Sequence, residues 1–531
     1  EDEYKSLMKN KTWELAKLPH DKKAIGGKWV YKLKRDAEGH VVRFKARWVA
    51  QGFSQLQVQG LEYNETFAPV LKNKSLKILL ALANERDYEI KQLDITTAFL
   101  NSQIEDGLLL YVNQPTGFEY GDERTKCLLK RTLYGLKQSP HAWNNTLNEF
   151  IVSQGYKRCM TDSCVYVKCG SSGKMMYLTV FVDDILSMYS KEDEGDWLKM
   201  KKLFERRFDI KDMDDVKVIV GIEIKRDREK KMLTLSQRAC IIDMLKKFNM
   251  DQCKSVATPA VAGTKAKLTK EMCPQDEEEV EYMKKVPYMS AIGSLLYIAT
   301  CTRPDIAHSV NEVSRYQTNP GVEHWSAVKR IMRYLRGTLD KVLTFSSNEN
   351  MNGKMNDVHS NEANVLGYSD SDWGGEVDER KSTTGNVVKL NGCTVSWITK
   401  KQTTVALSSA ESEFVAVVSM AKELMWLKQL LNELGMKSKR KMLVDNQAAI
   451  KIAKNDTLHD RTKHISIKHH FVRQCVQDSE FEIEYINTSM NQADIFTKAL
   501  GTKQFIYLCD LVLGIEASTS LYDHSDESEH K

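Results

Sequence analysis

The segment Tyr177–Ser187, YLTVFVDDILS, places two adjacent aspartates, Asp183 and Asp184, inside a run of strand-forming apolar residues. Carboxylates are normally kept out of such runs, because burying an unpaired charge costs free energy. A single aspartate at this point would most simply cap a strand or a turn. An adjacent pair within residues 175–188, which the pattern predicts to be a hairpin or its second strand, suggests instead a site whose ligand neutralises both charges.

A third carboxylate stands in a comparable setting earlier in the chain. Asp94 ends the strand-like IKQLD, and the residues that follow, ITTAFL, are predicted to run into a helix. If the fold brings these strands side by side, three carboxylates meet and raise each other's pKa. Divalent cations relieve that repulsion, and Mg²⁺ prefers oxygen ligands. Two such ions about 3.5–4 Å apart support in-line phosphoryl transfer.

The last third of the chain carries four more acids, each in a different predicted element. Asp370 lies on a first strand in GYSDSDW, and Glu413 lies on a long amphipathic helix in AESEFVA. Asp445 stands at the end of a strand in LVDNQ, and Asp494 opens a final helix in NQADIFTK. The same cation-based logic applies to this second set. Asp370 and Asp372 are alternatives for the first acid of this set. We choose Asp370 because it follows the strand directly.

The whole chain sets the limits for these two sites. Its 531 residues are too many for one ordinary domain, and its formal net charge of +5 is mildly basic. An odd number of cysteines, 11, argues against a secreted disulfide framework and for a reducing compartment. No apolar run approaches the ~20 residues that span a bilayer, so we expect no membrane partner. The chain does not begin with methionine, and we expect it to be a processed or excised piece of something longer.

Three motifs, in this order and spacing, resemble the reverse transcriptase of copia-type LTR retrotransposons: QLDITTAFL, LYGLKQSPHAW and VFVDDILS. The N-terminal KNKTWELAKLP, GGKWVYKLKRDAEGHVVRFKARWVAQGF and YNETFAPV resemble the same family, as do VGIEIKRD and YMSAIGSLLYIATCTRPDI. The resemblance covers about residues 1–505. It implies an α+β multidomain fold, in which a right-hand polymerase with fingers, palm and thumb precedes an α/β ribonuclease H-like domain.

The resemblance also implies domain boundaries. Residues 1–250 would form the fingers and palm, and 251–345 the thumb or connection region. The polar stretch 346–364 would be a linker, 365–505 the ribonuclease H-like domain, and 506–531 a flexible C-terminal tail. The basic amphipathic helix EHWSAVKRIMRYLRG, 323–337, is a candidate for the thumb element that grips the duplex.

In the polymerase, the resemblance assigns two Mg²⁺ ions to Asp94 and Asp183, with Asp184 as a weaker or supporting ligand. Phe99 would lie beneath the sugar and exclude a ribose 2′-OH. A basic β-hairpin within residues 28–47 would close over the triphosphate, through Lys45 or Arg47; one sequence does not decide between these two. The floor of the nucleotide pocket would be shaped by Tyr134, Gly135 and Lys137.

In the last third, the resemblance points to the ribonuclease H set of four acids, Asp370, Glu413, Asp445 and Asp494, which would bind two further metal ions. Glu411 and Glu413 are alternatives for the glutamate of this set. We choose Glu413 because the residues after it match the E-x-x-A helix pattern of that family. A stretch with three histidines, RTKHISIKHHF, also resembles the family. Its histidines are His464, His469 and His470. A zinc site there is disfavoured. These histidines would instead assist product release or contact the hybrid.

These assignments predict an RNA-directed DNA polymerase with ribonuclease H endonuclease activity, using Mg²⁺ with Mn²⁺ able to substitute. Its partners would be an RNA template, a DNA primer, the RNA–DNA hybrid, dNTPs, and the integrase and capsid of the same element. We expect it in cytoplasmic virus-like particles, with later nuclear access of the product complex. The alternatives are a domesticated nucleic-acid-binding protein without polymerase activity, and a nuclease whose polymerase half only binds the hybrid.

Overall fold

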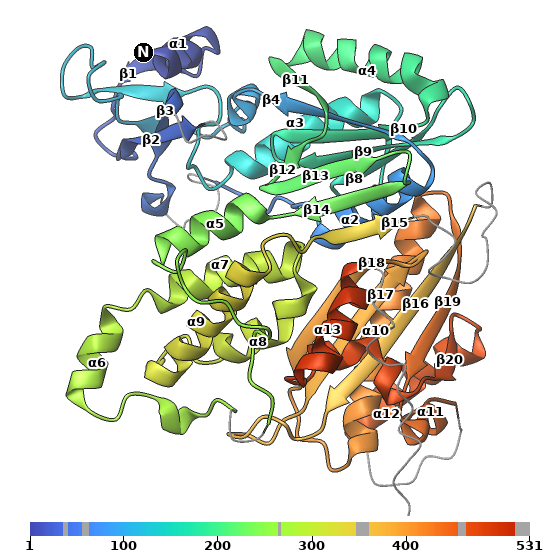
Figure 1. Ribbon diagram of the computed structural model, residues 1–531. Coiled ribbons are helices and arrows are strands. Elements are labelled where there is room, and N and C mark those ends of the chain that lie inside the picture. The colour runs from blue at the N-terminus through green and yellow to red at the C-terminus, as the bar shows by residue number, and fades with distance from the viewer. Residues whose placement is uncertain (36–40, 56–62, 264–266, 347–360, 455–462, 516–531) are drawn as a thin grey trace, which may run out of the picture. The chain divides into compact units, whose positions relative to one another are not determined.

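The computed structural model describes residues 1–35, 41–55, 63–263, 267–346, 361–454 and 463–515. The chain divides into two compact units (Figure 1). Unit 1 comprises residues 1–72 and 89–215, and unit 2 comprises 73–88 and 216–531. Each unit combines helices with mostly antiparallel sheets, which confirms the predicted α+β class.

The main sheet of unit 1 has six antiparallel strands in the order β11-β4-β10-β9-β8-β7. The helices α3 (Ser139–Ser153) and α4 (Glu194–Arg207) pack on it through a core that includes Trp143 and Phe204. Strands β8, β9 and β10 supply much of this core, because consecutive residues along them are buried. The strands are β4 (Glu89–Ile95), β7 (Lys157–Arg158), β8 (Val165–Cys169), β9 (Met175–Phe181), β10 (Asp184–Tyr189) and β11 (Ile210–Asp215).

A smaller core in unit 1 surrounds Trp48 and Leu133. It is built by a three-stranded sheet, β1-β6-β5, and by the two-stranded sheet β2-β3. The second of these is the basic hairpin that the sequence predicts, although its predicted turn, 36–40, lies outside the described residues. The remaining elements of this unit are α1 (Asp2–Lys9), β1 (Trp13–Lys17), β2 (Gly27–Arg35), β3 (Val41–Ala50), η1 (Gly52–Ser54), η2 (Ala98–Asn101), β5 (Tyr111–Val112), β6 (Thr125–Leu129) and η3 (Lys191–Asp193).

The first part of unit 2 joins a four-stranded sheet, β12-β13-β14-β15, to a group of helices. The helix α2 is buried along most of its length, and its Asn84 amide donates to the carbonyls of Lys231 and Phe345. The elements are α2 (Asn73–Glu85), β12 (Val218–Ile219), β13 (Ile222–Asp227), β14 (Met232–Ser236), α5 (Arg238–Lys247), η5 (Lys270–Met272), α6 (Glu277–Lys284), α7 (Tyr288–Cys301), η6 (Pro304–Ile306), α8 (Ala307–Ser314), α9 (Val322–Gly337) and β15 (Leu343–Ser346).

The second part of unit 2 is a five-stranded sheet in the order β18-β17-β16-β19-β20. Strands β18, β17 and β16 are antiparallel to one another. Strand β19 pairs in parallel with β16, and β20 pairs in parallel with β19. This mixed order, with the long helix α10 packed on β16 and β17, is the expected α/β ribonuclease H-like arrangement. The elements are β16 (Glu362–Asp372), β17 (Thr383–Leu390), β18 (Cys393–Lys401), α10 (Ser409–Glu433), β19 (Lys437–Val444), α11 (Gln447–Lys454), α12 (Lys463–Gln477), β20 (Glu482–Tyr485), η8 (Thr488–Met490), η9 (Gln492–Phe496) and α13 (Thr502–Leu513).

Several local expectations need correction. The predicted tail boundary at residue 506 falls inside α13, whose apolar face, including Leu508 and Val512, is buried. The predicted linker ends earlier than residue 364, because β16 begins at Glu362. The helices predicted after Asp94 and at Asp494 are short 3₁₀ segments, η2 and η9. Residues 347–360 and 516–531, predicted as linker and tail, lie outside the described part of the chain, and the other domain boundaries remain predictions.

Candidate active sites

The paired aspartates of the opening motif lie at the turn of the hairpin between β9 and β10. In the sheet register Asp184 pairs directly with Asp94 of β4. The backbone carbonyl of Asp183 accepts a hydrogen bond from the Ile95 amide, at 2.8 Å. The fold therefore brings all three carboxylate-bearing residues to one edge of the sheet, as the sequence predicts.

Two side chains that the sequence analysis did not select hold this turn. Val182 has a left-handed backbone, φ 58°, which is unfavourable for a β-branched residue. Its carbonyl accepts a hydrogen bond from the Trp143 indole at 2.7 Å, which stabilises that strained conformation. The Gln92 amide donates to Asp184 at 2.9 Å and orients its carboxylate.

The electrostatics at this edge oppose ionisation. Burial raises the pKa of Asp183, and the neighbouring Asp94 adds to the effect, while Arg47 and Lys45 act against it. Burial also raises the pKa of Asp184, again reinforced by the other two aspartates. The sequence does not decide between Lys45 and Arg47 as the triphosphate contact. Both side chains lower the pKa of Asp183, and Arg47 has the larger effect.

The residues expected around the nucleotide form a connected row. The rings of Phe99 and Tyr134 meet edge to face, with centroids 5.1 Å apart. The guanidinium of Arg47 lies 4.8 Å from the Tyr134 ring centroid, and burial raises the pKa of that tyrosine to about 12. Tyr134 therefore lies between Arg47 and Phe99 and contacts both.

Gly135 and Lys137 have structural roles that can be read directly. Gly135 has φ 92°, and a Cβ there would lie 2.1 Å from the Ala50 carbonyl oxygen, so only glycine fits beside the end of β3. The Lys137 ammonium donates to the Gln55 carbonyl at 3.3 Å and to the Tyr63 hydroxyl at 3.4 Å. Both residues hold the segment after β6 against the end of β3 and the residues that follow it.

The second set of acids converges on the five-stranded sheet of unit 2. Asp370 lies near the end of β16, and Asp445 follows the last residue of β19, the strand that runs parallel to it. Asp494 lies in η9, which packs on β16 and β17. One carboxylate oxygen from each of Asp370, Asp445 and Asp494 lies within 4.8 Å of the others.

Glycine 385 makes this convergence possible. It lies opposite Asp370 in the β16–β17 register. A Cβ on Gly385 would lie 2.5 Å from the Thr497 methyl group and 2.7 Å from the Ala493 carbonyl oxygen. The absence of a side chain at this position lets η9, and Asp494 with it, approach the sheet.

Glu413 completes the set from helix α10. Burial raises its pKa to about 9, with Asp370 and Asp445 contributing, and its Oε2 is buried without a hydrogen-bond partner among the described residues. Burial likewise raises the pKa of Asp494 to about 8, with Asp370 contributing. Hard oxygen donors, mutual repulsion and an orphaned buried oxygen together fit a divalent cation.

The two competing acids have other partners. Asp372 is half-buried, and its carboxylate lies 3.9 Å from the Lys267 ammonium. The Glu411 carboxylate accepts from the Leu407 amide at 2.7 Å, and its own amide donates to the N-cap Ser408. Glu411 is therefore part of the cap of α10.

Among the described residues, only the Asp370 group has three such ligand atoms within 4.8 Å. Asp94, Asp183 and Asp184 are neighbours in the backbone without reaching that spacing. The side chains of His464 and His469 lie outside the described part of the chain, whereas His470 is exposed. Three evenly spaced cysteines lie in unit 1: Cys159 and Cys164 are buried, whereas Cys169 is exposed.

The helix predicted to grip a duplex, α9, uses its arginines within unit 2. Arg333 and Arg336 each donate through Nε to a backbone carbonyl, of Lys254 and Asp251 respectively, at 2.7 Å. Arg330 donates to the Thr258 hydroxyl at 3.0 Å. These bonds fasten the segment 251–258 to the helix and leave further guanidinium donors on each side chain.

Two further residues beside the second acid set escaped the sequence analysis. The Thr497 hydroxyl donates to Asp370 at 2.5 Å, and the Lys498 ammonium lies 3.1 Å from Asp494. The spacing of four residues between Asp494 and Lys498 is the signal that could have indicated the second contact.

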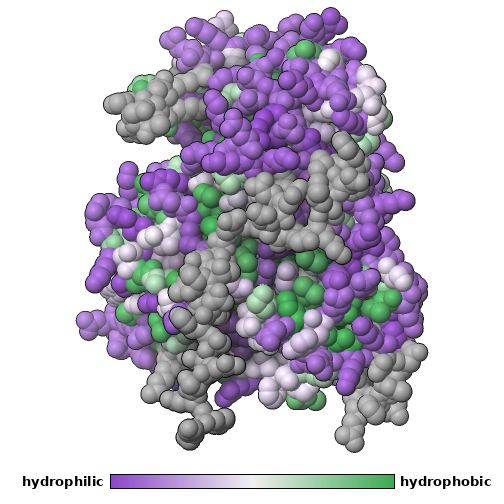
Figure 2. Space-filling model, turned by 45° about the vertical axis from the view of Figure 1, so that its right-hand side comes forward, coloured by the Kyte–Doolittle hydropathy of each residue, from purple (hydrophilic) through white to green (hydrophobic). Residues whose placement is uncertain are grey.

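On the face that Figure 2 draws, hydrophilic residues cover most of the surface. In the described part of the chain, no helix has both the length and the apolarity that crossing a bilayer requires.

Comparison with known proteins shows a similarity to reverse transcriptases. Residues 10–262 match the family model described as reverse transcriptase (RNA-dependent DNA polymerase). The Pol polyprotein of transposon TNT 1-94 from Nicotiana tabacum is 41% identical over 520 residues, 98% of this chain and 38% of its own length. That of transposon RE2 from Arabidopsis thaliana is 35% identical over 511 residues, 95% of this chain and 33% of its own length.

The chain belongs to the Pol proteins of copia-type retrotransposons. It spans about a third of the length of these relatives. Among solved structures, a foamy viral protease–reverse transcriptase in complex with double-stranded DNA is 14% identical, with 91% of this chain and 81% of that chain covered and a TM-score of 0.45. The fold assignment of both units therefore rests on their strand order and not on this likeness.

Substitution of Gly385 tests the packing that positions Asp494. Gly385→Ala is expected to destabilise the chain by about 1–3 kcal/mol, because the new methyl group overpacks the contact with η9. The measurement is the denaturant-unfolding transition. Gly293→Ala, in α7 where a Cβ meets nothing within 4 Å, is the matched control and should stabilise by about 0.5–1 kcal/mol. Equal effects of the two substitutions would contradict the close approach.

The raised pKa of Glu413 predicts a pH dependence of stability. A carboxyl whose folded pKa of about 9 exceeds its ordinary value of 4.5 stabilises the fold at low pH. That contribution is lost as the pH rises from about 4.5 through about 9. Without divalent metal, the unfolding free energy of the parent should therefore fall relative to that of Glu413→Gln across this range. A constant difference between the two proteins would contradict the assignment.

Proposed function

We propose that this chain is an RNA-directed DNA polymerase with ribonuclease H activity, acting on the RNA of a copia-type element. The observation that carries the proposal is the presence of two separate acid sets, one on the hairpin turn of unit 1 and one on the sheet of unit 2. Membership in the Pol family and the match of residues 10–262 to reverse transcriptases support the first activity. The four acids on the five-stranded sheet support the second.

For the polymerase, Asp94 and Asp183 would hold two Mg²⁺ ions, with Asp184 as a supporting ligand. When bound, these ions supply activation of the attacking oxygen and stabilisation of the leaving one. Lys45 and Arg47 add positive charge on the same side, where a triphosphate needs it. Both are therefore proposed contacts, and Arg47 is also placed by its stacking on Tyr134.

The nucleotide would be selected by the row of aromatic side chains. Phe99, braced edge to face by Tyr134, is proposed to lie beneath the sugar and to exclude a 2′-OH. Gly135 and Lys137 are proposed to shape the pocket floor by fixing the segment that carries Tyr134.

For hydrolysis, Asp370, Glu413, Asp445 and Asp494 would hold the second pair of Mg²⁺ ions, for which Mn²⁺ could substitute. Glu413 contributes a buried carboxylate oxygen that has no other described partner. Asp370 is oriented by the Thr497 hydroxyl.

The two activities would act on one product. Copying RNA leaves an RNA–DNA hybrid, which proteins recognise mostly through shape, phosphates and 2′-OH groups. We therefore propose RNA template, DNA primer, hybrid and dNTPs as partners, with integrase and capsid from the same element. Virus-like particles in the cytoplasm, followed by nuclear access, are the proposed location.

Single substitutions separate the two activities. Asp183→Asn should abolish primer extension on an RNA template with dNTPs and Mg²⁺ and leave hydrolysis of a preformed hybrid intact. Asp370→Asn should do the reverse, because each removes one ligand from one site only. Glu411→Gln, at the α10 cap, is the matched control for the second site. Loss of both activities from either aspartate change would refute separate sites, and hybrid binding without extension by the parent would favour a binding protein.

A further inference from the structure

Lys498 is a basic residue that lies beside the proposed metal site of unit 2. Its ammonium lies 3.1 Å from the Asp494 carboxylate, whose side chain is 1% exposed. Its backbone amide donates to the Asp494 carbonyl, so the turn after η9 fixes the start of the side chain. A single positive charge is thus held against the most deeply buried carboxylate of the cluster.

The charge of Lys498 acts on more than one acid. Burial works against its charged form, but Asp370, Asp494 and Asp445 outweigh this and raise its pKa. Lys498 in turn lowers the pKa of Asp494 and of Asp445, against the stronger effect of their burial. The ammonium therefore compensates the same three carboxylates whose oxygens lie within 4.8 Å of each other.

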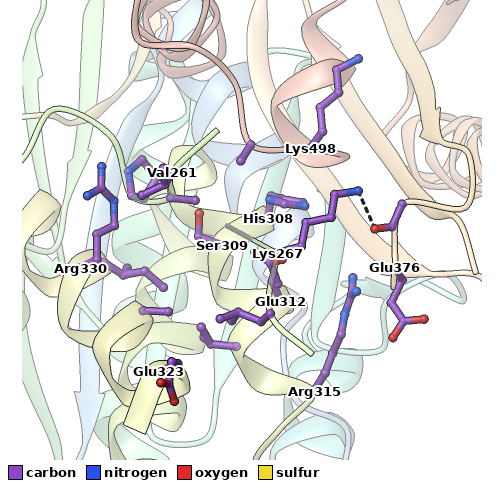
Figure 3. A pocket seen from close by; sticks show the side chains of 18 of the residues that line it. Val261, Lys267, His308, Ser309, Glu312, Arg315, Glu323, Arg330, Glu376 and Lys498 are labelled. Atoms are coloured by element: carbon purple, nitrogen blue, oxygen red, sulfur yellow. Dashed lines mark hydrogen bonds between the residues drawn. The ribbon is translucent and has the colours of Figure 1, made fainter. Parts of the chain in front are cut away.

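The side chain also has space to move. Lys498 borders a cavity of about 600 Å³, whose wall includes His308, Glu312 and Arg315. In Figure 3 the Lys498 side chain extends away from the other labelled side chains of that wall. Its side chain is 40% exposed, so leaving Asp494 does not require repacking of the core. An incoming cation can therefore displace the ammonium at low structural cost.

We propose that Lys498 is a built-in counter-cation that holds the Asp370–Asp445–Asp494 cluster together without metal and is displaced from Asp494 when a divalent cation binds. Lys498 is thus a positioning residue for the cluster, and it lowers metal affinity while it stabilises the metal-free fold. The inference rests on the proposed function only in requiring that this cluster binds a cation.

The test is titration of MnCl₂ into the full chain by calorimetry, without nucleic acid, together with thermal unfolding with and without Mn²⁺. All proteins carry Asp94→Asn and Asp183→Asn, so that the first acid set does not contribute. On this background, the neutral variants Lys498→Met and Lys498→Gln are compared with Lys498→Arg, which keeps the charge. Lys441→Met is the matched control, because Lys441 is similarly exposed, 37%, and pairs with Glu484 at 2.7 Å outside the cluster.

Both neutral variants should bind Mn²⁺ about tenfold more tightly, because one nearby positive charge no longer competes. They should melt at a lower temperature without metal and gain more from Mn²⁺ than the background protein, whereas Lys498→Arg and Lys441→Met should match it. Unchanged or weaker Mn²⁺ binding, or an equal loss of stability with and without Mn²⁺, would overturn the inference. Absence of Mn²⁺ binding in the background protein itself would overturn the proposed metal site and this inference with it.

Discussion

Repulsion between buried carboxylates is the constraint on which both candidate sites depend. Three aspartates meet at one sheet edge in unit 1, and four acids meet at the sheet of unit 2. Burial raises the pKa of Asp183, Asp184, Glu413, Asp445 and Asp494. A chain tolerates such groups when a ligand repays their desolvation, and their hard oxygen atoms indicate a divalent cation.

The surrounding structure keeps the acids in place against that repulsion. In unit 1 the Trp143 indole holds the strained Val182 turn, and Gln92 holds Asp184. In unit 2 the bare backbone of Gly385 admits η9 against the sheet. These contacts come from elements remote in sequence, so the free energy of folding of each unit is what pre-organises its site.

Much of this could be predicted from the sequence. A run of strand-forming apolar residues located the β9–β10 hairpin, and two alternating runs around a turn signal located β2–β3. Helical periodicity located α10, and the order of motifs indicated the family. The contacts around the acids could not be predicted, because they depend on tertiary approach. Nothing local marks Thr497 as a partner of Asp370, or Gly385 as a contact of η9. The helix expected at Asp494 is a five-residue 3₁₀ segment, since its backbone serves the sheet contact rather than a helix.

The most direct test of the central claim is the number of Mn²⁺ ions that the full chain binds at equilibrium, measured by dialysis. We expect Asp183→Asn and Asp370→Asn each to remove part of the bound Mn²⁺, and the combined variant to lose the sum of the two. Binding that either single substitution abolishes completely, or a parent chain that binds no Mn²⁺, would contradict two independent cation sites.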